Sequence, residues 1–400
     1  MKTLAESAIQ NSFKNKAILA PISDDEGHAF VTYRVDRSLH SPDIFEEIAI
    51  GQSLGAWDER FVDRTQLEQK VIKIISIVED ANCYRGTLAF PQTLWHGRLS
   101  WLLTLMYGKM SFYRGVCLER LSFNSHCFTS ERLTGPRVSL SDVRLRTGAP
   151  ANKPLLMGIL KPNVAMSDDA ISELYAEVAQ AGVHLVKDDE IRHDADFRDT
   201  LKRIEKVANR KSKEKLKTLY VAHAPIDRCA YADLKDWSLQ LQNAGADALL
   251  INVWTVGIQL LQELRSVTTL PLMAHPALAG ALGQGFEGDA ISPQTSMGSL
   301  VRAAGADLTL FPSPYGKIGL PKTAALAIAS ACKEQWEAQV LSTTPVPSAG
   351  IKPEHVEQAC GDFGSDFVLN AGTAIFASGR SVAESARDFL GRLEAYRYAL

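Results

Sequence analysis

The sequence lacks the features that mark secreted, membrane-spanning or nucleic-acid-binding chains. Its 400 residues include only six cysteines, which are scattered and form no CxxC pair, so we expect reduced thiols of a cytoplasmic protein rather than a disulfide scaffold or a zinc site. No uncharged apolar run approaches the roughly 18 residues that a membrane helix needs, and the first thirty residues carry charges throughout, unlike a signal peptide. The formal net charge is −3, and no dense cluster of Lys and Arg interleaves with aromatic residues. Neither a nucleic acid nor a membrane is therefore an expected partner.

The composition, with 46% hydrophobic and 22% charged residues, is that of a globular chain long enough for two domains. Residues 1–145 are predicted to form a ferredoxin-like α+β domain with strands at 30–36 and 87–91 and a helix-like run at 99–111. The Gly- and Pro-rich stretch 134–154 is typical of a connector. Residues 146–400 form a second predicted domain, in which strand-like and helix-like segments alternate.

Short apolar runs alternate with helix-like segments from about residue 150 onward. In the helix-like segment 167–181, Ser167 is placed to cap the first turn and Gly182 to end the last. The segments AQAGVHLV, NAGADALL and RAAGADLTL repeat one helix–strand joint. Eight strands alternating with helices favour a (β/α)₈ TIM barrel over an open sheet. The eight runs are 154–160, 183–187, 218–224, 247–253, 270–275, 306–311, 346–350 and 367–371.

A polar, chemically capable side chain stands at nearly every predicted strand end, where the active sites of such barrels lie. The stretch VHLVKDDE (183–190) could by itself be a strand that runs into a solvated turn, because charges usually mean surface. The ring of polar residues indicates instead that it belongs to a site. The residues at the strand ends are Lys161, Lys187, Asp188, Asp189, Glu190, His223, Asn252, His275 and Ser348.

The carboxylates after the second strand could hold a hard divalent cation such as Mg²⁺, which prefers oxygen ligands. Lys187 could join them only after its neutral amine reacts with CO₂ to form a carbamate, and nearby carboxylates alone would keep it protonated, so we expect the metal's charge to favour the carbamate. The alternative is a surface Lys–Asp pair worth less than about 1 kcal/mol.

Several motifs in one order carry a resemblance to a known family. GILKPNVAMS, AGVHLVKDDE, LPLMAHPA, LFPSPYGK, VPSAGI and NAG resemble segments of the large chain of ribulose-bisphosphate carboxylase (RuBisCO) and of RuBisCO-like proteins, with the match running from residue 51 to about 380. The resemblance implies a homodimer with active sites shared between subunits. It also implies Mg²⁺ held by carbamylated Lys187, Asp189 and Glu190.

Four departures argue against CO₂ fixation. Carboxylases have Glu at the position of Gly51, Lys at Asn163, Arg at Pro276 and His at Leu310. The missing Arg and His would bind the second phosphate of a bisphosphate, and each such charge-assisted bond is worth roughly 1.5–3 kcal/mol. A monophosphate with an apolar far end is therefore the expected substrate.

MYGKMSF, LMAHPALAGA, VPSAGI and the GAW of GQSLGAW resemble one branch, the 2,3-diketo-5-methylthiopentyl-1-phosphate enolases of methionine salvage. That resemblance implies a keto–enol isomerase in which neutral Lys109 removes a proton from C1 of a metal-polarised diketone. Lys161 would hold the enolate or phosphate side, and His275 would be a polar donor. Ser348, Gly350 and Gly372 match the phosphate loops, and Thr373 stands at a further position of the same loops. From the residues alone, Lys109 could equally be a lysine that snorkels at a helix end, and His275 a hydrogen-bonded structural histidine.

Two residues depart from the enolase pattern. Thr373 replaces a phosphate-loop glycine, and Lys317 matches the mobile-loop lysine of carboxylases that contacts substrate, where enolases have a small residue. They keep open a different RuBisCO-like isomerase or decarboxylase that acts on a keto-sugar or sugar-acid monophosphate. A non-catalytic scaffold is a third possibility, which the intact KDDE cluster disfavours.

Overall fold

A computed structural model of the chain describes residues 18–19, 21–22, 25–55, 69–129, 132–226, 229–283, 290–336 and 340–397. Ala56 and Trp57, the end of the GAW segment, lie outside these ranges. The chain divides into two compact units. The first comprises Met1–Thr134, Leu278–Leu300 and Glu334–Val340, and the second comprises Gly135–Ala277, Val301–Lys333 and Leu341–Leu400.

The first unit is built on a four-stranded antiparallel sheet in the order β2-β3-β1-β4. The central strand β1 buries alternate side chains, including Val31, Tyr33 and Val35, as expected of a strand with one face against a core. The α+β character predicted for the N-terminal part is confirmed. Its strands are β1 (His28–Asp36), β2 (Lys73–Glu79), β3 (Cys83–Pro91) and β4 (Val116–Phe123). Its helices include α3 (Ile44–Ser53), α5 (Gln92–Trp95), α6 (Leu99–Leu103) and α13 (Ala279–Leu282).

The helix-like run at 99–111 differs from a regular α-helix. After α6 it widens into the π-helix η1 (Thr104–Gly108) and then tightens into the 3₁₀ turn η2 (Met110–Phe112). Tyr33 of β1 fixes the π-helix to the sheet, because its hydroxyl donates to the Met106 carbonyl oxygen over 2.6 Å. π-helical turns occur frequently at functional sites, and this one ends immediately before Lys109.

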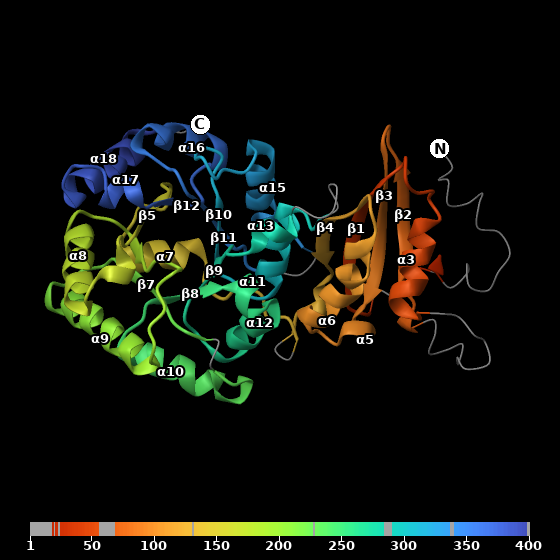
Figure 1. Cartoon of the computed structure of the whole chain (residues 1–400), viewed down its shortest axis with the longest axis horizontal. Coiled ribbons are helices and arrows are strands. Elements are labelled where there is room, and N and C mark those ends of the chain that lie inside the picture. The colour runs from red at the N-terminus through yellow and green to blue at the C-terminus, as the bar shows by residue number, and fades with distance from the viewer. Residues whose placement is uncertain are drawn as a thin grey trace. The chain divides into compact units, whose positions relative to one another are not determined.

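The second unit is a barrel of eight parallel strands surrounded by helices (Figure 1). The strands follow in the order β11-β10-β9-β8-β7-β6-β5-β12, and β11 and β12 contact each other to complete the ring. Each of the eight predicted strands is confirmed to within about two residues. The strands are β5 (Leu155–Ile159), β6 (Leu185–Lys187), β7 (Leu219–His223), β8 (Ala248–Asn252), β9 (Leu272–His275), β10 (Leu308–Pro312), β11 (Thr344–Ser348) and β12 (Val368–Ala371).

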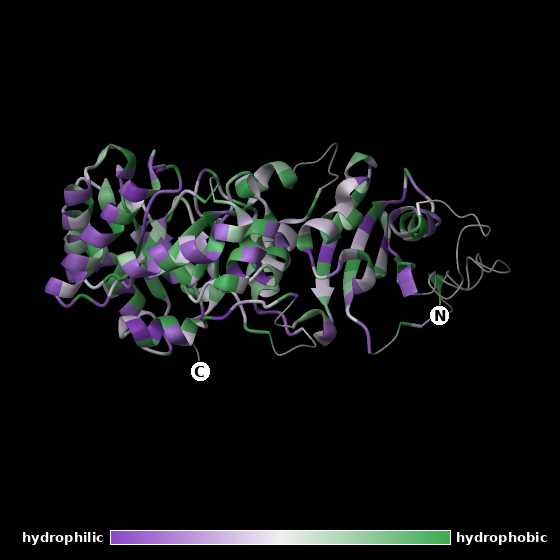
Figure 2. Ribbon diagram, turned by 90° about the horizontal axis from the view of Figure 1, so that it is seen from below, coloured by the Kyte–Doolittle hydropathy of each residue, from purple (hydrophilic) through white to green (hydrophobic). Residues whose placement is uncertain are grey.

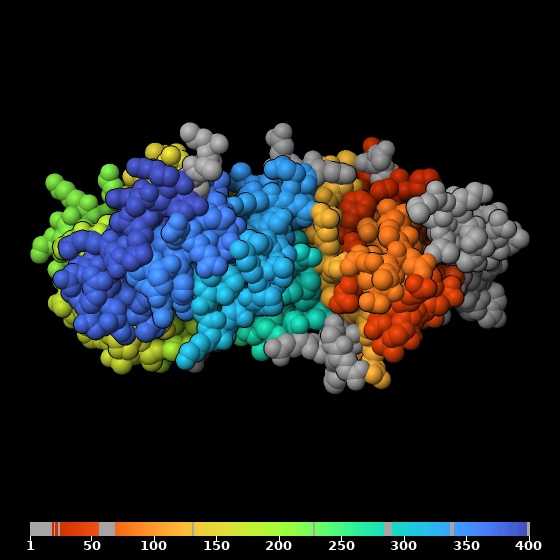
Figure 3. Space-filling view, turned by 90° about the horizontal axis from the view of Figure 1, so that it is seen from above, coloured from red at the N-terminus to blue at the C-terminus, as the bar shows by residue number. Residues whose placement is uncertain are grey.

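The helices of this unit turn their apolar faces toward the strands. Figure 2 shows the strands mostly in green, for hydrophobic residues, and the helices in a mixture of green and purple. Figure 3 shows α18, in dark blue, on the outer surface of the unit. The longer helices are α8 (Asp168–Gln180), α9 (Phe197–Lys213), α10 (Leu234–Ala244), α12 (Ile258–Val267), α15 (Lys322–Lys333), α16 (Val356–Phe363) and α18 (Val382–Ala395). The short helices are α11 (Val253–Val256), α14 (Leu300–Ala303) and α17 (Thr373–Phe376).

Helix α8 begins and ends as predicted. The Ser167 hydroxyl accepts the backbone N–H of Ala170 over 3.3 Å, which satisfies a free donor of the first turn. Gly182 follows the helix with φ +96°, a left-handed conformation that glycine adopts at low cost. Local capping chemistry therefore sets both ends of this helix.

The predicted connector 134–154 contains a helix, which is a correction to the sequence analysis. Helix α7 (Leu140–Thr147) starts with a capping box between Ser139 and Asp142 and ends at Gly148, with φ +72°. Its Val143 packs into the barrel's apolar core with residues at the starts of the strands. The Gly and Pro residues at both ends of 134–154 hid this short helix, which closes the end of the barrel opposite the strand exits.

Within the described ranges no helix is long and apolar enough to cross a membrane. All six cysteines are free thiols. No disulfide therefore joins any of the six cysteines, and burial of apolar side chains must support the fold.

A half-buried histidine makes the fold sensitive to acid. His184 precedes β6, and its Nδ1 accepts the backbone N–H of Leu156 over 3.0 Å, so Nδ1 carries no proton in the folded state. Burial lowers the pKa of His184 to about 4, whereas the unfolded value stays near 6.5. Because the unfolded chain then binds the proton and the folded chain does not, stability falls as pH drops from about 6.5 to about 4, by up to about 3 kcal/mol.

We expect His184→Asn, which keeps an acceptor but cannot titrate, to flatten this part of the stability profile. Urea unfolding at a series of pH values measures it. An unchanged slope between pH 6.5 and 4 in the variant would contradict the assignment.

Candidate active site

The turn after β6 is organised around Asp188, which is fully buried. Its carboxylate forms an ion pair with Arg203 of α9, and it accepts the Tyr220 hydroxyl over 2.7 Å and the His223 N–H over 2.9 Å. Successive residues of an extended chain point to opposite sides, so anchoring Asp188 outward turns Lys187 and Asp189 inward. Asn163 adds a further donor, with its Nδ2 3.2 Å from Asp188 Oδ1. Asp188 is thus committed to the framework of the site.

Lys187, Asp189 and Glu190 gather at the barrel mouth as predicted. The Lys187 amine is fully buried and lies 3.3 Å from Glu190 Oε2 and 2.9 Å from the Asp188 carbonyl oxygen. Burial lowers the pKa of Lys187, against the opposing influence of the carboxylates. From the sequence, we expected those carboxylates to keep Lys187 protonated unless a metal was present. Because burial lowers the pKa, a larger fraction of the Lys187 amine is in the neutral form that reacts with CO₂, even before a metal binds.

The donor set at this turn would gain a third oxygen ligand for a hard cation if Lys187 carried a carbamate. Among the described residues no group of three or more His, Cys, Asp and Glu side chains is placed to hold a metal. Asp189 and Glu190 provide two carboxylates, and a carbamate on Lys187 would provide the third anionic ligand. The residues present therefore fit Mg²⁺ bound through a carbamate.

His275, at the end of β9, lies beside the same carboxylate. Its Nδ1 accepts the Ala277 N–H over 3.2 Å, which leaves the proton on Nε2, 3.4 Å from Glu190 Oε2. Burial lowers the pKa of His275 to about 3, so the ring is a neutral hydrogen-bond donor at physiological pH. Asn252, at the end of β8, fixes the Glu190 main chain by donating to its carbonyl oxygen over 3.1 Å.

Lys161 connects the carboxylate cluster to a neighbouring loop. Its amine lies 2.5 Å from Asp189 Oδ2 and is about a third exposed. A Cβ atom placed on Gly372, after β12, would lie 3.4 Å from Lys161 Cε, so the two residues are adjacent. Lys161 is thus within reach of both the carboxylate cluster and the loop predicted to bind phosphate.

The predicted phosphate loops after β11 and β12 carry unusual backbone geometry. Ala349 and Gly350 both have left-handed φ angles, +64° and +69°. A Cβ on Gly350 would lie 2.3 Å from Gly316 Cα, so only glycine fits where the two loops touch. The Ser348 hydroxyl accepts Asn370 Nδ2 over 2.7 Å, which leaves its own proton available for an anion.

Gly350, Gly372 and Thr373 line one pocket of about 360 Å³. Two cationic residues of this pocket, Lys352 and Arg380, were not predicted from the sequence. Lys352 directly follows the VPSAGI segment and Arg380 lies eight residues after Gly372, but a single basic residue after a motif does not by itself indicate a ligand contact. Arg203 and Tyr220, which hold Asp188, were missed because a helix face and a strand interior give no such signal.

Lys317 lies in the loop after β10, next to Gly316, which touches Gly350. Its side chain is exposed, and the neighbouring Ile318 is 80% exposed. The base of the loop is anchored, since Tyr315 donates to Asp362 over 2.9 Å. The predicted substrate contact of Lys317 therefore stays a prediction.

Lys109 lies in the first unit, exposed at the end of the π-helix. It is next to another residue singled out from the sequence: a Cβ on Gly51 of α3 would lie 4.0 Å from Lys109 Nζ. The Lys109 amine also lies 6.0 Å from the centre of the Tyr113 ring.

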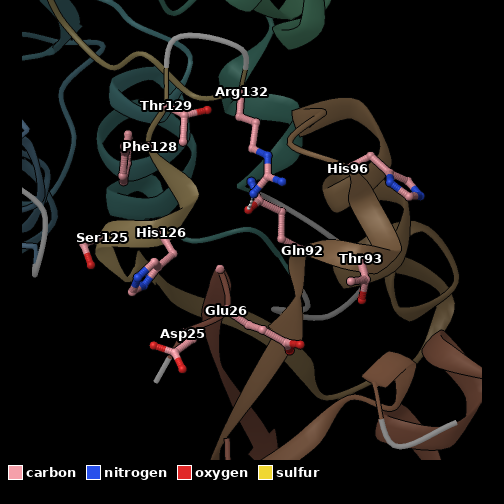
Figure 4. Close-up of a pocket in the computed structure, with 11 residues that line it drawn as sticks. Asp25, Glu26, Gln92, Thr93, His96, Ser125, His126, Phe128, Thr129 and Arg132 are labelled. Atoms are coloured by element: carbon pink, nitrogen blue, oxygen red, sulfur yellow. Dashed lines mark hydrogen bonds between the residues drawn. The ribbon is translucent and has the colours of Figure 1, made fainter. Parts of the chain in front are cut away.

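The first unit also has a larger pocket, of about 750 Å³ (Figure 4). Arg132 reaches toward its floor and donates to Gln92 over 2.6 Å, while His126 and Asp25 lie on another side. None of the predicted site residues lines it. The predicted chemistry is thus concentrated in the barrel and around Lys109.

The fold and the carboxylate cluster after the second barrel strand define a RuBisCO-like protein. Solved structures agree: a RuBisCO-like protein from Alicyclobacillus acidocaldarius superposes with a TM-score of 0.79, is 28% identical and covers 93% of this chain and 94% of its own. A RuBisCO from Pyrococcus horikoshii, 20% identical, also has a TM-score of 0.79 over 94% of this chain and 89% of its own, which shows the shared fold. No protein-family model matches the sequence.

The chain belongs to the 2,3-diketo-5-methylthiopentyl-1-phosphate enolase family, a family of enzymes. The enolase of Bacillus pumilus is 34% identical over 379 residues, which is 91% of each chain. The enolase of Microcystis aeruginosa is 31% identical over 373 residues, which is 91% of this chain and 93% of its own. The resemblance drawn from the motifs is confirmed.

The role of Asp188 in the framework can be separated from the roles of its neighbours. We expect Asp188→Asn to lower the free energy of unfolding by about 3 kcal/mol, because it leaves the buried Arg203 without a full partner. Asp189→Asn, whose partner Lys161 is about a third exposed, should cost far less. Urea unfolding of both variants measures the difference. Equal losses would contradict the framework role.

Proposed function

We propose that the protein catalyses the enolisation of 2,3-diketo-5-methylthiopentyl-1-phosphate in methionine salvage, a keto–enol isomerisation without CO₂ fixation. The observation that carries the proposal is the cluster of Lys161, Lys187, Asp189 and Glu190 at the barrel mouth in a chain of this family. The positions that would bind a second phosphate support the same reading. Leu310 is buried in the barrel's apolar core, and Pro276 carries no charge.

Carbamylated Lys187, Asp189 and Glu190 would hold Mg²⁺. When bound, the ion supplies Lewis acidity that makes the C–H beside a carbonyl more acidic. Lys187 contributes a buried amine whose lowered pKa favours the neutral form that reacts with CO₂. His275 stays neutral and keeps its Nε2–H directed at Glu190, which orients that carboxylate.

Proton transfer falls to the lysines. Neutral Lys109 removes a proton from C1, and the electron pair of the broken C–H bond forms the C1–C2 double bond. Lys161 donates to the oxygen on which negative charge develops. The single phosphate is received by Ser348 and by the backbone of the loops that contain Gly350, Gly372 and Thr373, where the pocket also presents Lys352 and Arg380.

We further propose that two copies form a homodimer in which Lys109 of one completes the barrel site of the other. The family resemblance supports this arrangement. The free cysteine thiols support a cytoplasmic location.

Lys109→Ala tests the base directly. We expect the variant to lose turnover of the diketone at least about 100-fold, the lower end of what a positioned general base contributes, while its circular dichroism and melting temperature stay unchanged because Lys109 is exposed. The assay follows enol formation by absorbance in Mg²⁺ and bicarbonate.

Retained turnover in Lys109→Ala would reject this residue as the base. An inactive wild-type protein that instead exchanges a proton of a keto-sugar monophosphate with deuterated solvent would favour the other isomerase or decarboxylase reading. Lys317 and Thr373 give that reading its support.

The carbamate can be observed without any substrate. We expect ¹³C-labelled bicarbonate with Mg²⁺ to give one carbamate resonance per chain by NMR, and Lys187→Met to remove it. Lys161→Met is the matched control and should keep the resonance, because Lys161 is only half-buried and paired with Asp189. A resonance that survives in Lys187→Met would place the carbamate elsewhere.

A further inference from the structure

Gly51 lies inside helix α3, where a glycine has no evident structural purpose. Its φ angle is not in the left-handed region that favours glycine. Among the described residues, the only atom within 4 Å of a Cβ built on it is Lys109 Nζ, at 4.0 Å, an ordinary contact distance. Glycine weakens a helix interior relative to alanine, because it loses more backbone freedom on folding. Neither the backbone nor the packing of α3 requires this glycine.

Among the described residues, the Lys109 amine is near an aromatic ring and is not paired with a carboxylate. The π-helix η1 ends directly before it, and the Tyr113 ring lies 6.0 Å from Nζ. Among the described residues the amine forms no ion pair. Glu47, one helical turn before Gly51 on α3, is the nearest acidic residue along that helix face, and it makes no ion pair with Lys109 within the described part of the chain.

We infer that Gly51 is a positioning residue that acts through Lys109: because Gly51 has no side chain, helix α3 keeps a carboxylate away from the amine, which must be neutral to act as a base. This inference rests on the proposed function and extends it, because it assigns to a neighbouring helix the environment in which the base works. A glutamate at position 51 would reach the Lys109 amine and keep it protonated to higher pH. The protonated amine cannot act as a base. A side chain of the same size without charge would leave the proton equilibrium unchanged.

The test compares Gly51→Glu with its uncharged, equal-sized match Gly51→Gln. The first readout needs no substrate: intact protein is labelled with trace acetic anhydride at pH 8, and the acetylation of Lys109 is measured by mass spectrometry relative to Lys73 in the same unit. An exposed ion pair should slow acetylation of Lys109 about two- to fivefold in Gly51→Glu, whereas Gly51→Gln should match the wild type.

The second readout is turnover. In Gly51→Glu we expect kcat/KM for the diketone to fall about two- to fivefold near neutral pH and to recover as pH rises, while Gly51→Gln keeps the wild-type pH profile. Gly51→Ala should keep its activity and melt at a higher temperature, because alanine favours the helix and meets no clash.

The outcomes separate the two proposals. Equal labelling and equal pH profiles in Gly51→Glu and Gly51→Gln would overturn the inference and leave the enolase function standing. A wild-type protein that does not enolise the diketone, but whose Lys109 labelling still falls in Gly51→Glu, would overturn the proposed function while supporting the electrostatic role of Gly51. A lower melting temperature for Gly51→Ala would show that α3 requires the glycine and would also overturn the inference.

Discussion

The buried ion pair between Asp188 and Arg203 is the contact on which the candidate site depends. Both side chains are fully buried, and the pair is surrounded by the Tyr220 hydroxyl, the His223 main chain and Asp194. Buried pairs seldom add net stability, because desolvation of the two charges offsets their attraction. Here the ion pair fixes the position of the Asp188 side chain. Asp188 is held against α9. Because side chains alternate along an extended chain, Lys187 and Asp189 then face the barrel mouth.

This arrangement explains why one strand ends in four charged residues. Lys187, Asp189 and Glu190 are the residues proposed to hold a metal, and Asp188 fixes their geometry. The same packing that holds Asp188 buries the Lys187 amine and lowers its pKa, so the framework also prepares the chemical state of a ligand-forming group. The packing around Asp188 therefore determines both the geometry of the turn after β6 and the pKa of Lys187.

The sequence predicted the barrel well because each of its units repeats a local signal. An apolar run, a capping serine such as Ser167 and a glycine such as Gly182 are readable without tertiary information. Helix α7 was missed because its apolar residues Leu140 and Val143 are recognisable as core residues only once the barrel is in place. The π-helix before Lys109 was missed because its cause includes a distant contact, the bond from Tyr33 to Met106. Arg203 was missed because its partner Asp188 lies on a different element. Lys352 and Arg380 were missed because they share a pocket only where the loops after β11 and β12 meet.

We propose that the turn after β6 binds magnesium only when Lys187 carries CO₂. Titration calorimetry of the full chain with Mg²⁺, in bicarbonate-saturated and in CO₂-free buffer, measures this dependence. We expect one ion per chain in the first buffer and sharply weaker uptake in the second. Equal uptake in both buffers, or none in either, would contradict it.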